Sequence, residues 1–134
     1  MFSLHPRLKA DTFLVKKLQT SSLYLMNDCR YKWLILVPEI ADLSELHQLN
    51  AAEFASVMNE IKKTSQLLAD LYTPKKINVG ALGNMVDQLH IHVIARNEDD
   101  FAWPGPVWGN GNSIPYTEQL RAEITKTIIN KLTG

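Results

Sequence analysis

The sequence has little cysteine and no long apolar run, and these absences already exclude several classes of protein. Its 134 residues include one cysteine, Cys29, which excludes an internal disulfide and a metal site built from several thiolates. The longest uninterrupted apolar run, Trp33 to Val37, is far shorter than the roughly 20 residues of a membrane-spanning helix. The first residues, MFSLHPRLKAD, contain no apolar signal core. We therefore expect a cytoplasmic protein without a membrane anchor.

A net charge is also absent. Fourteen Lys and Arg residues balance fourteen Asp and Glu residues, whereas a domain that binds the phosphates of duplex nucleic acid needs a basic excess. This balance argues against a nucleic-acid polymer as partner, although a pocket with a few dipoles can still bind one nucleotide. Hydrophobic residues make up 46% of the chain and charged residues 21%, a globular composition. The length fits a single domain over residues 1–134.

Extended apolar segments predict a mostly antiparallel sheet. Residues 22–26 and 33–37 are short, apolar and separated by a polar turn, which is typical of a hairpin. Residues 77–82 and 88–95 form a second pair around the turn-compatible Gly83-Asn84. Residues 12–15 are expected as a fifth strand at the edge of the sheet.

Two longer segments predict helices. The first begins at Asn50, which forms a capping-box pattern with Glu53, and apolar residues then recur at helical spacing to Tyr72. The second is expected over about residues 117–132. The Trp-, Pro- and Gly-rich stretch between the sheet and this helix excludes a regular helix or a central strand. The sequence therefore predicts an α+β fold in which two main helices pack on a five-stranded sheet.

The segment that carries chemistry is Gln88-Leu89-His90-Ile91-His92-Val93-Ile94. Side chains alternate between the faces of a strand, so Gln88, His90 and His92 are expected on one face and the apolar residues between them on the other. A row of imidazoles is costly to bury without partners, which indicates a functional site. Two alternatives are surface histidines and half of a metal site. A metal site needs a third ligand, and the other histidines, His5 and His47, lie in segments expected to be remote.

This segment resembles the signature of the histidine triad (HIT) superfamily, in which His, apolar, His, apolar, His is followed by two apolar residues. Gln88 stands in the place of the first histidine. Asn78 and Gly83-Asn84 match positions where such proteins place polar contacts to phosphate and leaving group. The order of elements agrees over about residues 10–111. The stretch Trp103-Pro-Gly-Pro-Val-Trp-Gly resembles a C-terminal feature of a bacterial branch of small HIT hydrolases.

The resemblance implies a HIT-like fold and a reaction at the α-phosphate of a nucleotide derivative, either a dinucleoside polyphosphate or a nucleoside phosphoramidate. His90 would attack the α-phosphorus and form a covalent nucleotidyl-histidine, and Gln88 would orient it through its main-chain carbonyl. His92 and Asn84 would stabilise charge on the phosphate or leaving group. An imidazole suits the first role because its ordinary pKa of ~6.5 leaves a neutral nitrogen at pH 7. No cofactor and no metal are required in this scheme.

Other side chains have both a structural and a functional interpretation. Asn78 either faces solvent or contacts the substrate, and Asn27 either lines a nucleoside pocket or caps its loop. Trp33 and Leu36 could wall a base pocket, although such strand residues are more often part of the core.

The two tryptophans of the C-terminal loop also have two interpretations, and one of them involves a partner subunit. Trp103 and Trp108 either contact a substrate group or a partner subunit, or they anchor their loop onto the sheet. The resemblance implies a symmetric homodimer, which would protect exposed strand edges. Two other functions remain: a nucleotide-binding module that has lost turnover, supported by the missing first histidine, and a metal-binding protein built on His90 and His92.

Overall fold

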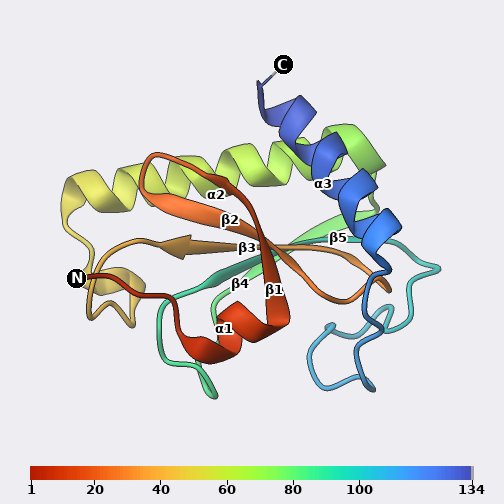
Figure 1. Cartoon of the computed structure of the whole chain (residues 1–134), viewed down its shortest axis with the longest axis horizontal. Coiled ribbons are helices and arrows are strands. Elements are labelled where there is room, and N and C mark those ends of the chain that lie inside the picture. Colours follow the sequence, from red (N-terminus) through yellow and green to blue (C-terminus); the bar gives the residue numbers. More distant parts are fainter. Residues whose placement is uncertain (134) are drawn as a thin grey trace.

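A five-stranded antiparallel sheet forms the centre of the computed structural model, which describes residues 1–133 (Figure 1). Its strands are, in chain order, β1 (Thr12–Lys17), β2 (Ser21–Met26), β3 (Lys32–Pro38), β4 (Lys76–Gly80) and β5 (Ile91–Arg96). Their spatial order is β1-β2-β3-β5-β4. The expected hairpin is β2 with β3, the expected edge strand is β1, and the second expected pair is β4 with β5.

Within the described residues, three helices and one short 3₁₀ turn accompany the sheet: α1 (Pro6–Asp11), η1 (Leu46–Gln48), α2 (Ala51–Tyr72) and α3 (Glu118–Thr133). The capping box of α2 is confirmed: the Asn50 carboxamide accepts from the Glu53 amide at 2.8 Å, and the Asn50 amide donates to the Glu53 carboxylate at 2.9 Å. The sequence pattern missed α1 because this helix is short and buries a single residue, Leu8.

Two strand boundaries were wrong. The second pair was expected over 77–82 and 88–95, but β4 ends at Gly80 and β5 begins at Ile91. The reason is the connection between them. The Leu89 amide donates to the carbonyl of Leu43 instead of to a neighbouring strand, and Gly83 takes a positive φ of 70°. Gln88 and His90 therefore precede the strand.

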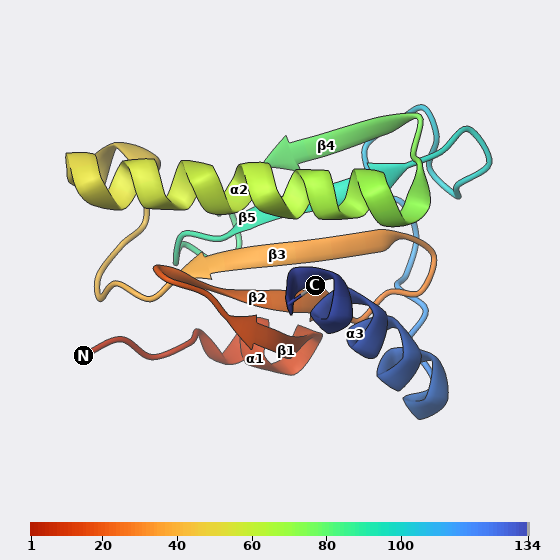
Figure 2. The same ribbon diagram turned by 90° about the horizontal axis from the view of Figure 1, so that it is seen from above.

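Both faces of the sheet are covered. Helices α2 and α3 lie over one face, and α1 lies on the other (Figures 1 and 2). Odd-numbered β5 residues and even-numbered β3 residues pack into the core under α2 and α3, whereas Trp33, Ile35 and Ile94 join Leu8 of α1 in a second core. Burial on two sides explains why β3 is apolar without alternation. No helix within residues 1–133 is long and apolar enough to cross a membrane.

Candidate active site

The two histidines of the motif lie together on the α1 side of the sheet. Their ring centroids are 5.0 Å apart, with an interplanar angle of 67°. His92 lies opposite Ile35 of β3 and Gly80 of β4. The expected alternation around them is confirmed, because Leu89 and Ile91 pack into the core on the opposite face. Both imidazoles are nearly buried, His90 at 7% exposed and His92 at 5%.

The His90 ring is oriented by the main chain of Gln88. Its Nδ1 lies 2.7 Å from the Gln88 carbonyl oxygen. A carbonyl oxygen only accepts hydrogen bonds, so Nδ1 carries the proton, and in the neutral ring Nε2 holds the lone pair. This is the arrangement that the family resemblance implied. A nucleophilic imidazole needs this arrangement, because the attacking nitrogen must present a lone pair while the other nitrogen keeps its proton in a hydrogen bond.

The side chain of Gln88 binds the N-terminal segment. Its Oε1 accepts from the His5 amide at 2.8 Å, and its Nε2 donates to the Ser3 carbonyl at 2.8 Å. Ser3 and His5 belong to the segment that leads into α1, on the same side of the sheet as the histidines. The expectation that His5 is remote was therefore wrong. One residue thus orients His90 and holds the N-terminal segment.

His92 is enclosed by aromatic rings. The Trp33 indole Nε1 donates to its Nδ1 at 2.9 Å, and the Trp108 ring packs edge-on at 5.1 Å between centroids. Burial, followed by the charge of neighbouring His90, lowers the pKa of His92 to about 3. The ring is therefore neutral at pH 7.

This lowered pKa predicts a loss of stability in mild acid. The pKa of His92 is about 3 in the folded chain against 6.5 ordinarily, so the unfolded chain binds the extra proton. The stability that the neutral His92 ring gives the folded chain is fully present above pH ~6.5 and is lost as the pH falls towards 3. From pH 7 to 5 we expect the free energy of unfolding to drop by about 2 kcal/mol, or roughly 5–8 °C in Tm. Thermal unfolding of His92→Gln should show a clearly smaller drop, and an equal drop in both proteins would contradict the assignment.

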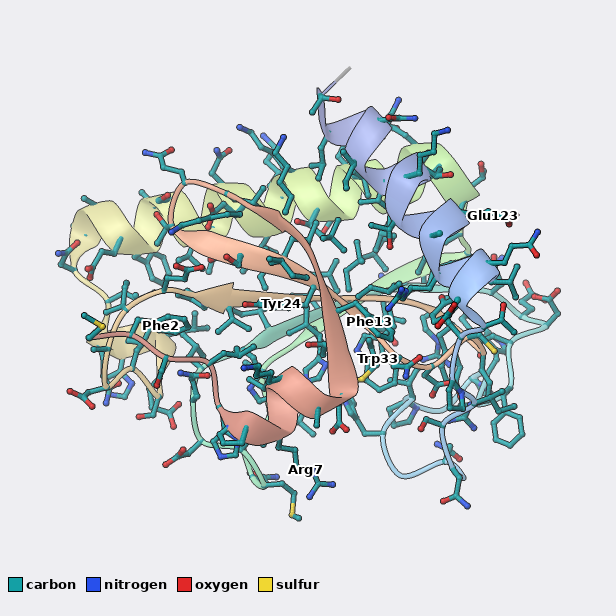
Figure 3. The ribbon with its side chains drawn as sticks, in the orientation of Figure 1. Phe2, Arg7, Phe13, Tyr24, Trp33 and Glu123 are labelled. Carbon is teal, nitrogen blue, oxygen red and sulfur yellow. The ribbon has the colours of Figure 1, made fainter. Side chains whose placement is uncertain are left out.

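A cavity of about 670 Å³ lies between α1 and the loop before α3, and neither motif histidine is among its lining residues. Trp33 and Trp108, the two rings that contact His92, form part of its wall, together with Asn27, Arg30 and Met85. In Figure 3, Trp33 lies between α1 and this loop. A second cavity of similar size, about 680 Å³, lies between β1 and α3 and has neither of these tryptophans in its wall. The first cavity combines aromatic walls with carboxamide and guanidinium groups, as binding sites for small polar ligands do.

Comparison with known proteins decides the family. The family model described as "HIT domain" matches residues 7–99. The chain belongs to the HIT family.

Solved structures of bacterial HIT proteins are similar over almost the whole chain. A histidine triad protein of Marinobacter aquaeolei is 40% identical, with a TM-score of 0.97 over 99% of this chain and 97% of its own. A HIT protein of Sinorhizobium meliloti is 42% identical, with a TM-score of 0.95 over 97% and 96%. One of Bradyrhizobium japonicum is 38% identical, with a TM-score of 0.94 over 97% of both chains. No curated protein matched. The expected HIT-like α+β fold is confirmed.

The remaining candidate residues of this HIT protein lie in different parts of the structure. Asn27 lines the cavity, and its Oδ1 accepts from the Tyr116 amide at 2.9 Å, so it binds the segment before α3 instead of capping its own loop. Gly83 and Asn84 lie in the loop before β5, where Asn84 is exposed. Of the two interpretations given to Leu36, a pocket wall or the core, the core is observed. Its even position on β3 places it in the core under α2.

Asn78 belongs to a buried polar network that the sequence did not reveal. Its Oδ1 accepts from Arg96 Nη1 at 2.9 Å. Arg96 is 1% exposed, donates twice to Asp100, at 2.7 and 2.9 Å, and once to the Gly105 carbonyl at 2.8 Å. This network ties the loop that carries Trp108 to the end of β5. An arginine that ends an apolar strand and is followed four residues later by an aspartate was the available signal.

Close packing also holds Trp108 in place. A Cβ atom built on Gly80 would lie 3.1 Å from Trp108 Cη2, so any side chain at this position would displace the ring. Of the two interpretations given to Trp108, anchoring on the sheet is therefore observed, and the ring also walls the cavity. Within residues 1–133, no three His, Cys, Asp or Glu side chains are grouped to hold a metal ion.

Proposed function

We propose that this HIT protein cleaves nucleotide derivatives at the α-phosphate through a covalent nucleotidyl-histidine on His90. The observation that carries the proposal is the 2.7 Å contact between His90 Nδ1 and the Gln88 carbonyl, which leaves the Nε2 lone pair available for attack. Membership of the HIT family supports nucleotides as the substrate class. Dinucleoside polyphosphates and nucleoside phosphoramidates are the proposed substrates.

The reaction has two displacements at phosphorus. In the first, the His90 Nε2 lone pair forms the N–P bond while the bond from phosphorus to the leaving group breaks, and the leaving group departs with that electron pair and takes up a proton from solvent. In the second, water attacks the same phosphorus and gives up a proton to solvent, while the N–P bond breaks and its electrons return to Nε2. The products are the nucleoside monophosphate and the released group. Catalysis by positioning and charge stabilisation suits phosphoryl transfer of this type.

The other residues of the site have roles in this proposal. His92 and Asn84 stabilise charge on the phosphate or leaving group, with backbone N–H groups of the loop around Gly83 contributing dipoles. Asn27 contacts the nucleoside in the cavity. Asn78, whose carboxamide oxygen is held by Arg96, retains its NH₂ group for the substrate. A symmetric homodimer is proposed by family resemblance.

Intact-protein mass spectrometry tests this function. During turnover of an adenosine phosphoramidate or a diadenosine polyphosphate, we expect the mass of the protein to increase by one adenylyl group. Peptide mapping should then place the group on the peptide that contains His90, and AMP should be released. Adenylylation of a different peptide would overturn the assignment of His90.

A binding module without turnover is the second candidate, because Gln88 stands where the family signature has its first histidine. In that case a nucleotide analogue would bind and raise the Tm by mass action, while both substrates would stay intact. The 2.7 Å Gln88–His90 contact is made by the main chain, which favours the enzyme.

A further inference from the structure

The contact between Trp33 and His92 determines where His92 carries its proton. An indole N–H only donates hydrogen bonds. Since Trp33 Nε1 lies 2.9 Å from His92 Nδ1, Nδ1 must offer its lone pair, and in the neutral ring the proton lies on Nε2. A proton on Nδ1 would put two N–H groups against each other. The same contact therefore disfavours both the other tautomer and the charged ring.

The two neighbouring histidines thus hold their protons on opposite nitrogens. In His90, the hydrogen bond to the Gln88 carbonyl keeps the proton on Nδ1, so Nε2 carries the lone pair. His92 has the lone pair at Nδ1 and the proton at Nε2. With the rings 5.0 Å apart, one imidazole offers a nucleophile and the next a hydrogen-bond donor. A displacement at phosphorus needs both.

We propose that Trp33 is a positioning residue that fixes His92 as a neutral Nε2–H donor towards the phosphate or leaving group. The proposal rests on the proposed function for its substrate, but its proton assignment stands on the structure alone. Trp33 reaches His92 from the neighbouring strand, where the register pairs Ile35 with His92 and Trp33 with Ile94. The two residues are therefore diagonal neighbours on one face of the sheet.

Nitrogen NMR of protein labelled with ¹⁵N-histidine tests the proton assignment without any substrate. In the native chain we expect His92 to show a pyridine-type Nδ1 and a pyrrole-type Nε2, with signals assigned by their loss in His92→Gln. In Trp33→Phe, which keeps an aromatic ring but has no N–H, a population protonated at Nδ1 should appear. A native His92 protonated at Nδ1, or unchanged signals in Trp33→Phe, would overturn the proposal.

A matched control separates the hydrogen bond from packing. Trp108 also contacts the His92 ring, but its Nε1 has no hydrogen-bond partner among residues 1–133. Trp108→Phe therefore removes the same N–H group without removing a hydrogen bond to His92, and the His92 signals should keep the native tautomer. If Trp108→Phe alters the tautomer as much as Trp33→Phe does, packing explains the effect and the proposal fails.

Kinetics test the catalytic consequence. For Trp33→Phe we expect kcat to fall about fivefold to tenfold, the equivalent of one neutral hydrogen bond, with little change in KM. If Trp33→Phe shifts the His92 tautomer but keeps the native kcat, the proposed role of the Nε2–H donor in catalysis is overturned. If Trp33→Phe does not fold, Trp33→His replaces it and should retain the native tautomer, because its ring can carry a donor N–H; a shift would count against the proposal. A native chain without turnover would refute the proposed function, while the spectra would still decide the proton assignment.

Discussion

Replacing His90 with alanine is expected to abolish formation of the nucleotidyl-protein and to lower kcat at least about 10³-fold. The reason is that the neighbouring imidazole cannot replace it, because the Nδ1 of His92 already accepts from Trp33 and its Nε2 holds the proton. Nucleotide should still bind, because the cavity walls formed by Trp108 and Asn27 remain. Single-turnover kinetics and intact mass should be measured on the same samples.

His47→Ala is the matched control for this experiment. His47 is exposed in the 3₁₀ turn η1 and has no role in the proposed mechanism, so its loss should leave kcat and adduct formation unchanged. His90→Ala with native turnover would refute His90 as the nucleophile. The reaction would then use either another nucleophile or direct attack by water, and the intact mass of the variant distinguishes the two.

Replacing Arg96 with methionine is expected to lower the free energy of unfolding by about 3–5 kcal/mol, because it leaves a buried charge without its partner. Burial alone would raise the pKa of Asp100, but hydrogen bonds from Arg96 and from backbone amides hold it below its ordinary value. Without the guanidinium, the Asp100 carboxylate keeps the cost of burial and loses its strongest compensation. Urea denaturation should show the loss.

Two further variants identify the cause. In Arg96→Met/Asp100→Asn no charge remains buried, so part of the loss should be recovered. Lys75→Met breaks a comparable contact with Glu98, but there both side chains are more than 60% exposed, and the change should stay within about 0.5 kcal/mol. If the Arg96→Met protein proves as stable as the Lys75→Met protein, the network has no supporting role.

Local patterns were enough to predict much of the fold. The long helix followed from the capping box of Asn50 and Glu53 and from helical spacing up to Tyr72, because both signals depend on residues three or four positions apart. The adjacency of His90 and His92 followed from strand alternation. Each of these features arises within one segment of the chain and needs no knowledge of its neighbours.

The contacts that complete the site could not be predicted in this way. Trp33 and Leu36 both fitted a pocket wall, and only the pairing of Ile35 with His92 decides that Trp33 shares a face with the histidine while Leu36 faces α2. The Gln88 side chain meets the N-terminal segment 83 residues away. Such contacts depend on strand register and loop path, which a local pattern does not determine.

The placement of the tryptophans gives this protein a built-in optical probe. The chain contains three: Trp33 and Trp108 form walls of the cavity and contact His92, and Trp103 lies against Arg96, with its ring 5.9 Å from the guanidinium. Two of its three indoles therefore report on the candidate site, and the third reports on the Arg96 network. Ligand entry, protonation of the histidines and detachment of the Trp108 loop can each be followed by intrinsic fluorescence, with no added label.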